Sequence, residues 1–189
     1  MGTETFDPRY KGLETWGEER ILAALLEGQA GATDAVRRAL PQLGKAALAI
    51  AERLSQGGRL VYAGAGTSGR LAVQDGVELT PTFGWPPERL AYILAGDDAA
   101  LTRSVEGAED DEEKARAVAA ERVMSGDAVV AVAASGRTPF TVGALGEARR
   151  KGAVAVAIAN NPATPLLAVA DHPILLDTGP ETIAGSTRM

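Results

Sequence analysis

The chain has 189 residues, of which 46% are hydrophobic and only 4% aromatic, and its formal net charge is -6. This length predicts one domain of ordinary size, and the acidic balance argues against nucleic acid as a partner, because phosphate backbones need basic patches. The absence of cysteine and the single histidine exclude disulfides, thiolate metal sites, a cysteine nucleophile and a histidine-rich metal centre. No signal peptide or membrane-spanning run is recognisable, so we expect a soluble, cytoplasmic protein with no membrane partner.

A polar arm followed by helices is expected at the start of the chain. Residues 1–17 contain three glycines and a proline and show little periodicity, and we interpret them as an extended arm of the kind that can wrap a partner subunit. From Glu18 onward the apolar residues recur at helical spacing, as in Ile21, Leu22, Leu25 and Leu26. A second helix is expected over about residues 33–56, where Pro41 would kink or split it.

Five short apolar runs then alternate with helical stretches. The expected strands are residues 59–63, 90–95, 127–132, 153–158 and 173–176. Most of them are continuously apolar, which is typical of strands buried on both faces. Helices are expected between them, at about 69–79, 98–123, 139–151 and 163–170. The alternation predicts an α/β fold: a three-layer α/β/α sandwich around a five-stranded parallel sheet of flavodoxin-like order, preceded by N-terminal helices.

Two of these strands end in loops that suit an anion. Gly64-Ala65-Gly66-Thr67-Ser68-Gly69-Arg70 follows the first strand, and Ala134-Ser135-Gly136-Arg137-Thr138-Pro139 follows the third. Glycines let the backbone approach an anion closely, the N-termini of the following helices offer free N–H groups, and hydroxyls add donors. We therefore predict a phosphate cradle formed by Gly66, Thr67, Ser68, Ser135, Gly136 and Thr138. The alternative is that both loops are tight turns and helix caps without a ligand.

The first loop also matches G-x-G-x-x-G, a pattern that alone would suggest a dinucleotide site. Asp75 falls too early for the ribose-binding acid, which is expected about 20 residues further on. The Gly-Lys-Ser/Thr ending of a nucleotide P-loop is also missing. These departures favour a phosphate ligand other than a nucleotide.

Carboxylates are the candidate catalysts. Glu78 is expected at the end of the helix that starts in the first loop, because Pro81 should stop that helix. A carboxylate there opposes the helix dipole, which favours the protonated form that a general acid needs. An acidic cluster over residues 106–113 includes Glu109, and most of its members are expected to be a solvated first helical turn. His172 is expected to be structural, and Asn160-Asn161 could line the site but reads more simply as a turn.

Several segments together resemble the N-acetylmuramic acid 6-phosphate etherase family, whose fold is a sugar isomerase (SIS) domain. They are the two loops, Glu78 with Pro81-Thr-Phe-Gly84, Val105-Glu-Gly-Ala-Glu-Asp110, and Gly179-Pro-Glu through Gly185-Ser-Thr-Arg-Met189. The glycine loops occur across SIS domains, whereas the combination with the other segments is much more specific. The resemblance covers nearly the whole chain.

The resemblance implies a lyase of amino-sugar metabolism and cell-wall recycling that converts N-acetylmuramic acid 6-phosphate to N-acetylglucosamine 6-phosphate and D-lactate. The family's proton donor corresponds to Glu78 and its second active-site glutamate to Glu109. It uses no metal or organic cofactor and forms homodimers with sites near the interface. Members continue beyond the last motif, so the resemblance implies a domain over residues 18–189 that stops before a C-terminal helical region, either as a fragment or as a natural truncation.

The implied chemistry is an elimination followed by hydration. In the ring-opened sugar the C1 aldehyde acidifies the C2 proton, which Glu109 could remove while Glu78 donates to the departing lactate oxygen at C3. The sequence leaves open which glutamate is the base. Two other functions remain open as well: a non-catalytic phosphosugar-binding regulator, and a phosphosugar isomerase that removes the C2 proton without cleaving at C3.

Overall fold

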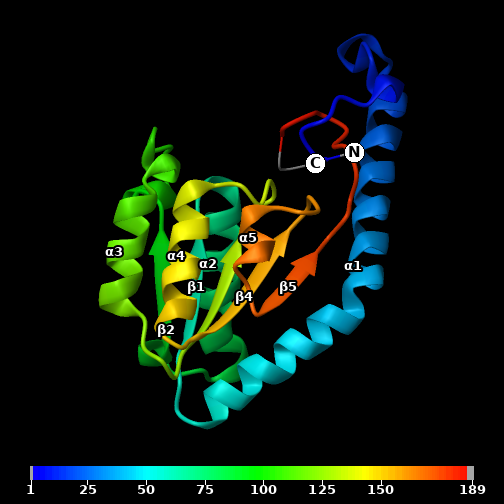
Figure 1. Cartoon of the computed structure of the whole chain (residues 1–189). Helices are drawn as coiled ribbons and strands as arrows, with labels where there is room; N and C mark the ends of the chain where they lie inside the picture. The colour runs from blue at the N-terminus through cyan, green and yellow to red at the C-terminus, as the bar shows by residue number, and fades with distance from the viewer. Residues whose placement is uncertain (1, 187–189) are drawn as a thin grey trace.

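A computed structural model describes residues 2–186 of the chain (Figure 1). Its α-helices are α1 (Glu18–Ser55), α2 (Gly66–Phe83), α3 (Glu112–Arg122), α4 (Pro139–Arg150) and α5 (Pro165–Ala168). Its strands are β1 (Leu60–Gly64), β2 (Leu90–Leu94), β3 (Ala128–Val132), β4 (Val154–Ala159) and β5 (His172–Leu175). Short 3-10 helices cover Pro8–Tyr10, Leu13–Thr15, Pro87–Arg89, Asp97–Leu101 and Ala108–Asp110.

The strands form one parallel sheet in the order β2-β1-β3-β4-β5. This order is the flavodoxin-like one, in which the crevice lies where the chain switches direction across the sheet, between β1 and β3. Residues 60–64 of β1 pair with 90–94 on one side and 128–132 on the other. The prediction of a five-stranded parallel sheet of this order is confirmed.

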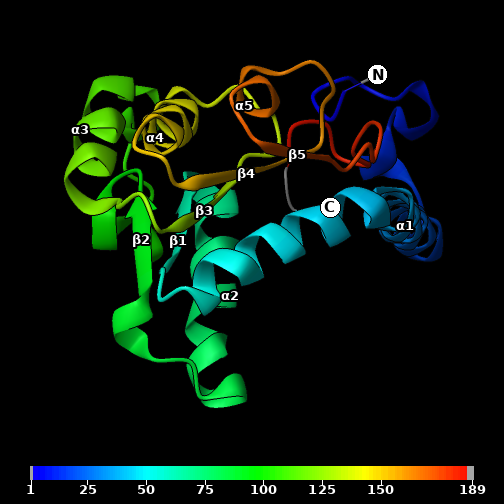
Figure 2. The ribbon, with the colours of Figure 1, turned by 60° about the horizontal axis from the view of Figure 1, so that its bottom comes forward.

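Alternation along the strands supplies one core on each face of the sheet. Val61, Ala63 and Val129 pack with side chains of α3, α4 and α5, among them Ala115, Phe140 and Leu166. The intervening residues, such as Leu60 and Tyr62, pack with Ala39 and Ala46 of α1 and Ala72 of α2. Figure 2 shows α1 and α2 on the face of the sheet opposite α4 and α5. The predicted three-layer sandwich is therefore confirmed, with small residues allowing close helix–sheet contact.

The start of the chain differs from the prediction. The expected break between two N-terminal helices is absent, and α1 is one helix of 38 residues that contains Pro41 and bends along its length (Figure 1). Gly28 lets α1 pack closely against the C-terminal segment, since a Cβ at this position would lie 2.8 Å from Thr182 Oγ1. Residues 2–17 contain two 3-10 turns, Pro8–Tyr10 and Leu13–Thr15, and Thr3 is buried where its amide donates to Asn161 Oδ1.

Two predicted helix boundaries are also wrong. Helix α2 continues through Pro81 to Phe83, and its stop is Gly84, whose left-handed conformation (φ 65°) lets its amide bond to the Thr80 carbonyl at 2.9 Å. The expected helix over 98–123 is broken, and only Glu112–Arg122 is α-helical. Gly107 at φ 71° interrupts it, and the Asp111 carboxylate caps α3 by accepting from the Lys114 amide at 2.9 Å. None of the described helices is both long and apolar enough to cross a membrane.

Candidate functional site

The two predicted loops meet at the carboxyl ends of β1 and β3, which are neighbours in the sheet. They line a cavity of about 400 Å³, here called the loop cavity. Its lining residues are Glu4, Ala65, Gly66, Thr67, Ser68, Glu109, Asp110, Ala134, Ser135, Arg137, Thr138 and Pro139. Five of the six residues predicted for the phosphate cradle are among them, and so is Glu109.

The start of α2 brings backbone N–H groups to this cavity, because Gly66, Thr67 and Ser68 all line it. The first intrahelical bond is donated by the Gly69 amide to the Ala65 carbonyl at 3.0 Å, so the amides of Gly66, Thr67 and Ser68 precede the hydrogen-bonded helix. Ala65, the residue before the helix, makes no side-chain cap. Three N–H groups at the positive end of an 18-residue helix are therefore available to an anion.

Gly136 has a different position from the rest of the predicted cradle. It is buried and does not line the loop cavity, and its amide donates to the Ala133 carbonyl at 2.9 Å. Its φ is 66°, and a Cβ there would lie 2.4 Å from Thr164 Oγ1. A side chain is excluded at this position both by the backbone conformation and by the space. Gly136 thus shapes the second loop, in which Ser135 Oγ also accepts a hydrogen bond from the Arg137 amide at 3.2 Å.

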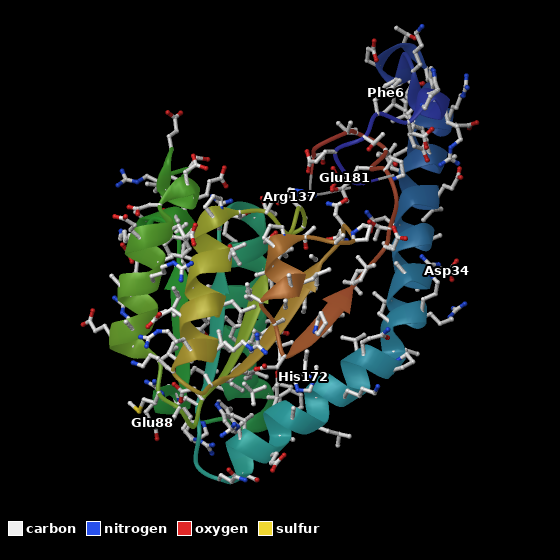
Figure 3. All side chains as sticks on the ribbon, in the orientation of Figure 1. Phe6, Asp34, Glu88, Arg137, His172 and Glu181 are labelled. Carbon is white, nitrogen blue, oxygen red and sulfur yellow. The ribbon has the colours of Figure 1, made fainter. Side chains whose placement is uncertain are left out.

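The arginines of the two loops have separate positions. Arg137 is exposed and lines the loop cavity, at the end of the sheet opposite His172 (Figure 3). Arg70 instead donates through Nε to the Ala100 carbonyl at 2.7 Å, which ties α2 to the 3-10 turn at Asp97–Leu101. Sequence reasoning did not single out Arg137, although it is the basic residue of the second loop and the cation of the cavity lining.

The two candidate glutamates are not brought together within the chain. Glu109 lies in the 3-10 turn Ala108–Asp110 on the wall of the loop cavity. Glu78 is exposed on α2, and at 1.5 Å per residue it lies roughly 18 Å along the helix from Gly66. It shares one helix face with Thr67 and Leu71, because residues spaced by four and seven positions lie above one another.

A second, larger cavity of about 710 Å³ adjoins the first. Its walls are residues 27–32 and Asp34 of α1, the segment 178–182, and Arg9, Tyr10, Thr67, Leu71, Ala134 and Asn160. Thr67 and Ala134 line both cavities, so the larger one extends from the loop cavity toward α1. The last predicted motif contributes Gly179, Pro180 and Glu181 here, while its final residues, 187–189, lie outside the described residues.

Asp75, which lies too early in the chain to be a ribose-binding acid, makes a hydrogen bond to another side chain of the protein. Its carboxylate accepts a hydrogen bond of 2.5 Å from the Tyr62 hydroxyl, which fastens α2 to β1. Burial, together with the hydrogen bond to Asp75, raises the pKa of Tyr62 far above its usual value, so Tyr62 stays protonated as the donor. Within residues 2–186, no three His, Asp or Glu side chains gather closely enough to hold a metal ion.

Several proteins of similar sequence share one name. An N-acetylmuramic acid 6-phosphate etherase of Deinococcus radiodurans is 53% identical over 188 residues, which make up 99% of this chain and 62% of that protein. Another, of Symbiobacterium thermophilum, is 54% identical over 155 residues, or 82% of this chain and 52% of that protein. The chain therefore spans between half and two thirds of the length of these relatives, and the predicted resemblance to this family is confirmed.

Solved structures and a family profile agree on the fold. A phosphoheptose isomerase from Francisella tularensis matches with a TM-score of 0.64 at 22% identity, over 84% of this chain and 83% of that one. At this identity the match supports the fold alone. The profile of the glucokinase regulatory protein N-terminal SIS domain matches residues 24–149, more than half of the chain. The chain therefore belongs to the SIS domain family that this profile describes.

Proposed function

We propose that residues 18–189 are the sugar isomerase domain of a cytoplasmic N-acetylmuramic acid 6-phosphate etherase, a lyase of amino-sugar catabolism and cell-wall recycling, with residues 1–17 as its arm. The observation that carries the proposal is that one cavity collects both glycine-containing loops and Glu109, in a chain 53% identical to an etherase. The alternatives, a regulator and an isomerase, share the phosphate cradle but need no acid for a leaving group at C3.

The substrate phosphate binds in the loop cavity. The amides of Gly66, Thr67 and Ser68 donate to its oxygens, and the hydroxyls of Ser135 and Thr138 approach it from the second loop. Arg137 supplies the one cationic side chain among the lining residues. Fixing the phosphate positions the sugar chain in the larger cavity, toward α1.

Elimination at C2 and C3 then releases lactate. The Glu109 carboxylate removes the C2 proton next to the C1 aldehyde, the C3–O bond breaks, and the lactate oxygen takes a proton from the second carboxyl group, Glu78. Water adds to C3 of the resulting unsaturated aldehyde and a proton returns to C2, which gives N-acetylglucosamine 6-phosphate. The atoms balance across these two steps, and neither step uses a metal or an organic cofactor.

Glu78 requires a second copy of the chain. It is exposed on α2 together with the apolar side chains of Leu71, Val77 and Phe83, which are 57%, 54% and 74% exposed. In a two-fold dimer that pairs α2 with its copy in antiparallel fashion, the second half of one helix lies beside the first half of the other. Glu78 would then approach the partner's loop cavity while the apolar side chains are covered.

The decisive experiment is to incubate the protein with N-acetylmuramic acid 6-phosphate and assay D-lactate. Release of lactate, lost in Glu109→Gln, is the expected result. Binding of N-acetylglucosamine 6-phosphate without lactate release would instead favour a regulator. Solvent exchange at C2 of that sugar phosphate, without cleavage of the ether substrate, would favour an isomerase.

The roles of the two glutamates can be separated by solvent exchange. Glu109→Gln should abolish both C2 exchange and lactate release, because proton removal comes first. Glu78→Gln should abolish lactate release while leaving some C2 exchange. Exchange lost only in the Glu78 variant would reverse the roles. Each variant must first be shown to bind N-acetylglucosamine 6-phosphate, and sedimentation should show the dimer.

A further inference from the structure

The N-terminal segment contributes one wall of the loop cavity. Glu4 lines this cavity together with Ser68 and Ser135, although the three residues are far apart in the sequence. We propose that Glu4 is a specificity-determining residue that accepts hydrogen bonds from hydroxyl groups of the bound sugar phosphate, and that Asn161 is the positioning residue that holds it there. This inference rests on the proposed function, since it takes the loop cavity as the phosphosugar site.

A clamp fixes the backbone beside Glu4. The Thr3 amide donates to Asn161 Oδ1 at 2.9 Å, and Asn161 Nδ2 donates to Thr3 Oγ1 at 3.0 Å. Asn161 Nδ2 also donates to the Ala134 carbonyl at 3.1 Å, at the start of the second loop. One side chain thus ties the residue before Glu4 to the residue before Ser135, so the arm and the phosphate loop are held in a fixed relation.

The clamp is closely packed. Thr3 is only 1% exposed. A Cβ on Gly2 would lie 2.3 Å from Asn161 Oδ1, so a side chain at this position is excluded unless Asn161 moves. On the other side, Gly185 approaches the carboxylate, since its own Cβ would lie 3.2 Å from Glu4 Oε2. Segments from both ends of the chain therefore flank Glu4, whose side chain is exposed and lines the cavity.

Charge decides what Glu4 can bind. The cavity lining carries three carboxylates, Glu4, Glu109 and Asp110, against the single cation Arg137. A carboxylate repels a phosphate group, so Glu4 is not a phosphate ligand. It is a pure acceptor that already takes one long hydrogen bond from Thr3 Oγ1, at 3.4 Å, and it has room for more. The sugar hydroxyls are donors outside the phosphate group, and inorganic phosphate has no counterpart of them. The charged acceptor makes these bonds stronger than neutral ones.

One substitution should therefore change the affinities for the two ligands differently. In Glu4→Gln, affinity for N-acetylglucosamine 6-phosphate should fall about ten-fold, because a charged acceptor is lost. Affinity for inorganic phosphate should stay unchanged or increase, because a repelling charge is removed. Isothermal titration measures both. Glu19→Gln, which removes an exposed charge from the first turn of α1, is the matched control and should change neither affinity.

Equal losses for both ligands in Glu4→Gln would overturn the inference, because they would mean that the arm only supports the cradle. An unchanged affinity for the sugar phosphate would overturn it as well, while the proposed function would stand if the wild type binds this ligand and releases lactate. Failure of the wild type to bind the sugar phosphate would overturn the proposed function and this inference together.

The clamp has its own test. Asn161→Leu removes the hydrogen bonds to Thr3 and to the Ala134 carbonyl. It should lower affinity for N-acetylglucosamine 6-phosphate as much as Glu4→Gln, and it should lower affinity for inorganic phosphate less. If Asn161 acts through Glu4, the double variant should bind the sugar phosphate no more weakly than either single variant. Fully additive losses would overturn the positioning role. Asn161→Asp, which keeps the acceptor for the Thr3 amide, should show a smaller loss.

Discussion

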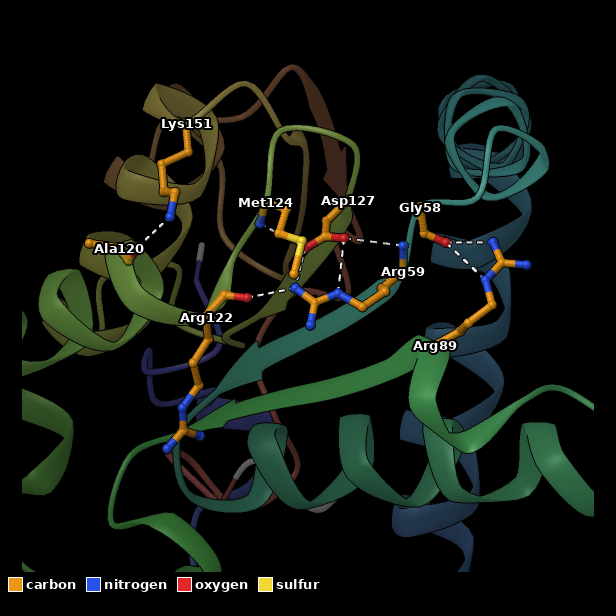
Figure 4. A network of polar contacts seen from close by, with 8 residues as sticks. All are labelled: Gly58, Arg59, Arg89, Ala120, Arg122, Met124, Asp127 and Lys151. Carbon is orange, nitrogen blue, oxygen red and sulfur yellow. Dashed lines mark hydrogen bonds and ion pairs between the residues drawn. The ribbon is translucent and has the colours of Figure 1, made fainter.

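The two ends of the sheet use their polar groups in opposite ways. At the amino ends of the strands, Asp127 is 2% exposed and accepts hydrogen bonds from the Arg59 guanidinium and from the amides of Arg59 and Met124 (Figure 4). Arg59 also donates to the Arg122 carbonyl, and Arg89 donates to the Gly58 carbonyl. At the carboxyl ends, the loop cavity is lined by hydroxyls, carboxylates and the first amides of α2.

This difference indicates that one end of the sheet serves stability and the other serves ligand binding. Buried polar groups that satisfy one another hold β1, β3 and the end of α3 together, whereas the opposite end leaves donors and acceptors facing a cavity. Substitutions at the amino end should therefore change the free energy of unfolding with little effect on ligand affinity. Substitutions in the loop cavity should do the reverse.

The largest effect is expected for Asp127→Ala. It leaves the Arg59 guanidinium and two backbone amides without their acceptor, which should lower the free energy of unfolding by about 3–5 kcal/mol. Urea denaturation measures the change. Asp98→Ala, at an exposed position, is the control and should stay within about 0.5 kcal/mol of the wild type. Equal losses in the two variants would contradict the assigned role of the network.

A matched pair of glycine substitutions compares the two ends directly. A Cβ on Gly58 would lie 2.0 Å from the Gly126 carbonyl oxygen, and Gly58→Ala should cost about 3 kcal/mol because backbone must move. Gly66 has open space around it and a φ of 53°, so Gly66→Ala should cost only about 1 kcal/mol. Affinity for inorganic phosphate should nevertheless fall only in Gly66→Ala, because Gly66 lines the loop cavity and Gly58 does not. A phosphate defect in folded Gly58→Ala would break the comparison.

The sequence predicts this architecture well and the site in part. Continuous apolar runs place all five strands within a residue or two, and the position of the loops after β1 and β3 places Ser68 and Ser135 at one cavity. Such patterns are local in the sequence. Because β1 and β3 are adjacent in the sheet, the loops that follow them lie side by side. The stop at Pro81 was predicted wrongly because Gly84 provides the helix cap three residues later.

What the sequence could not predict depends on distant contacts. The clamp between Thr3 and Asn161 joins residues 158 positions apart, and no local sequence pattern around either residue predicts this contact. Gly136 and Arg70 lie in loops whose composition suits a ligand, yet one packs on Thr164 and the other binds the Ala100 carbonyl. Glu78 is a motif residue whose position on an exposed helix face follows only from the three-dimensional arrangement.

A smaller, pH-dependent effect is expected from the same amino-end network. Burial raises the pKa of Asp127, but the hydrogen bonds from Arg59 and the Met124 amide outweigh it and hold the pKa below its usual value. The resulting stabilisation is fully present above the unfolded-state pKa of about 3.9 and is lost as the pH falls through the lower folded-state value. The stability advantage of the wild type over Asp127→Asn should therefore shrink below about pH 4. A constant difference from pH 7 to pH 3 would contradict the low pKa.

The smallest change in stability, together with a clear change in binding, is expected for Ser68→Ala and Ser135→Ala. Ser68 is not the cap of α2, and Ser135 Oγ accepts one bond within its own loop, so each loss should cost less than about 1 kcal/mol of stability. Both serines line the loop cavity, and removing either hydroxyl should weaken binding of N-acetylglucosamine 6-phosphate about five- to ten-fold. The unphosphorylated sugar should bind no better to the variants than to the wild type.

Ser55→Ala is the control at the other end of the sheet. Its hydroxyl donates to the Glu52 carbonyl at 2.7 Å near the end of α1, so the substitution removes a comparable hydrogen bond without touching the cavity. Its sugar phosphate affinity should equal that of the wild type. If Ser68→Ala and Ser135→Ala also left this affinity unchanged, the two hydroxyls would have no part in binding. The phosphate would then be bound through backbone amides and Arg137. If Ser55→Ala lowered it as much, stability and binding would be coupled through the sheet, and the two ends would not be independent.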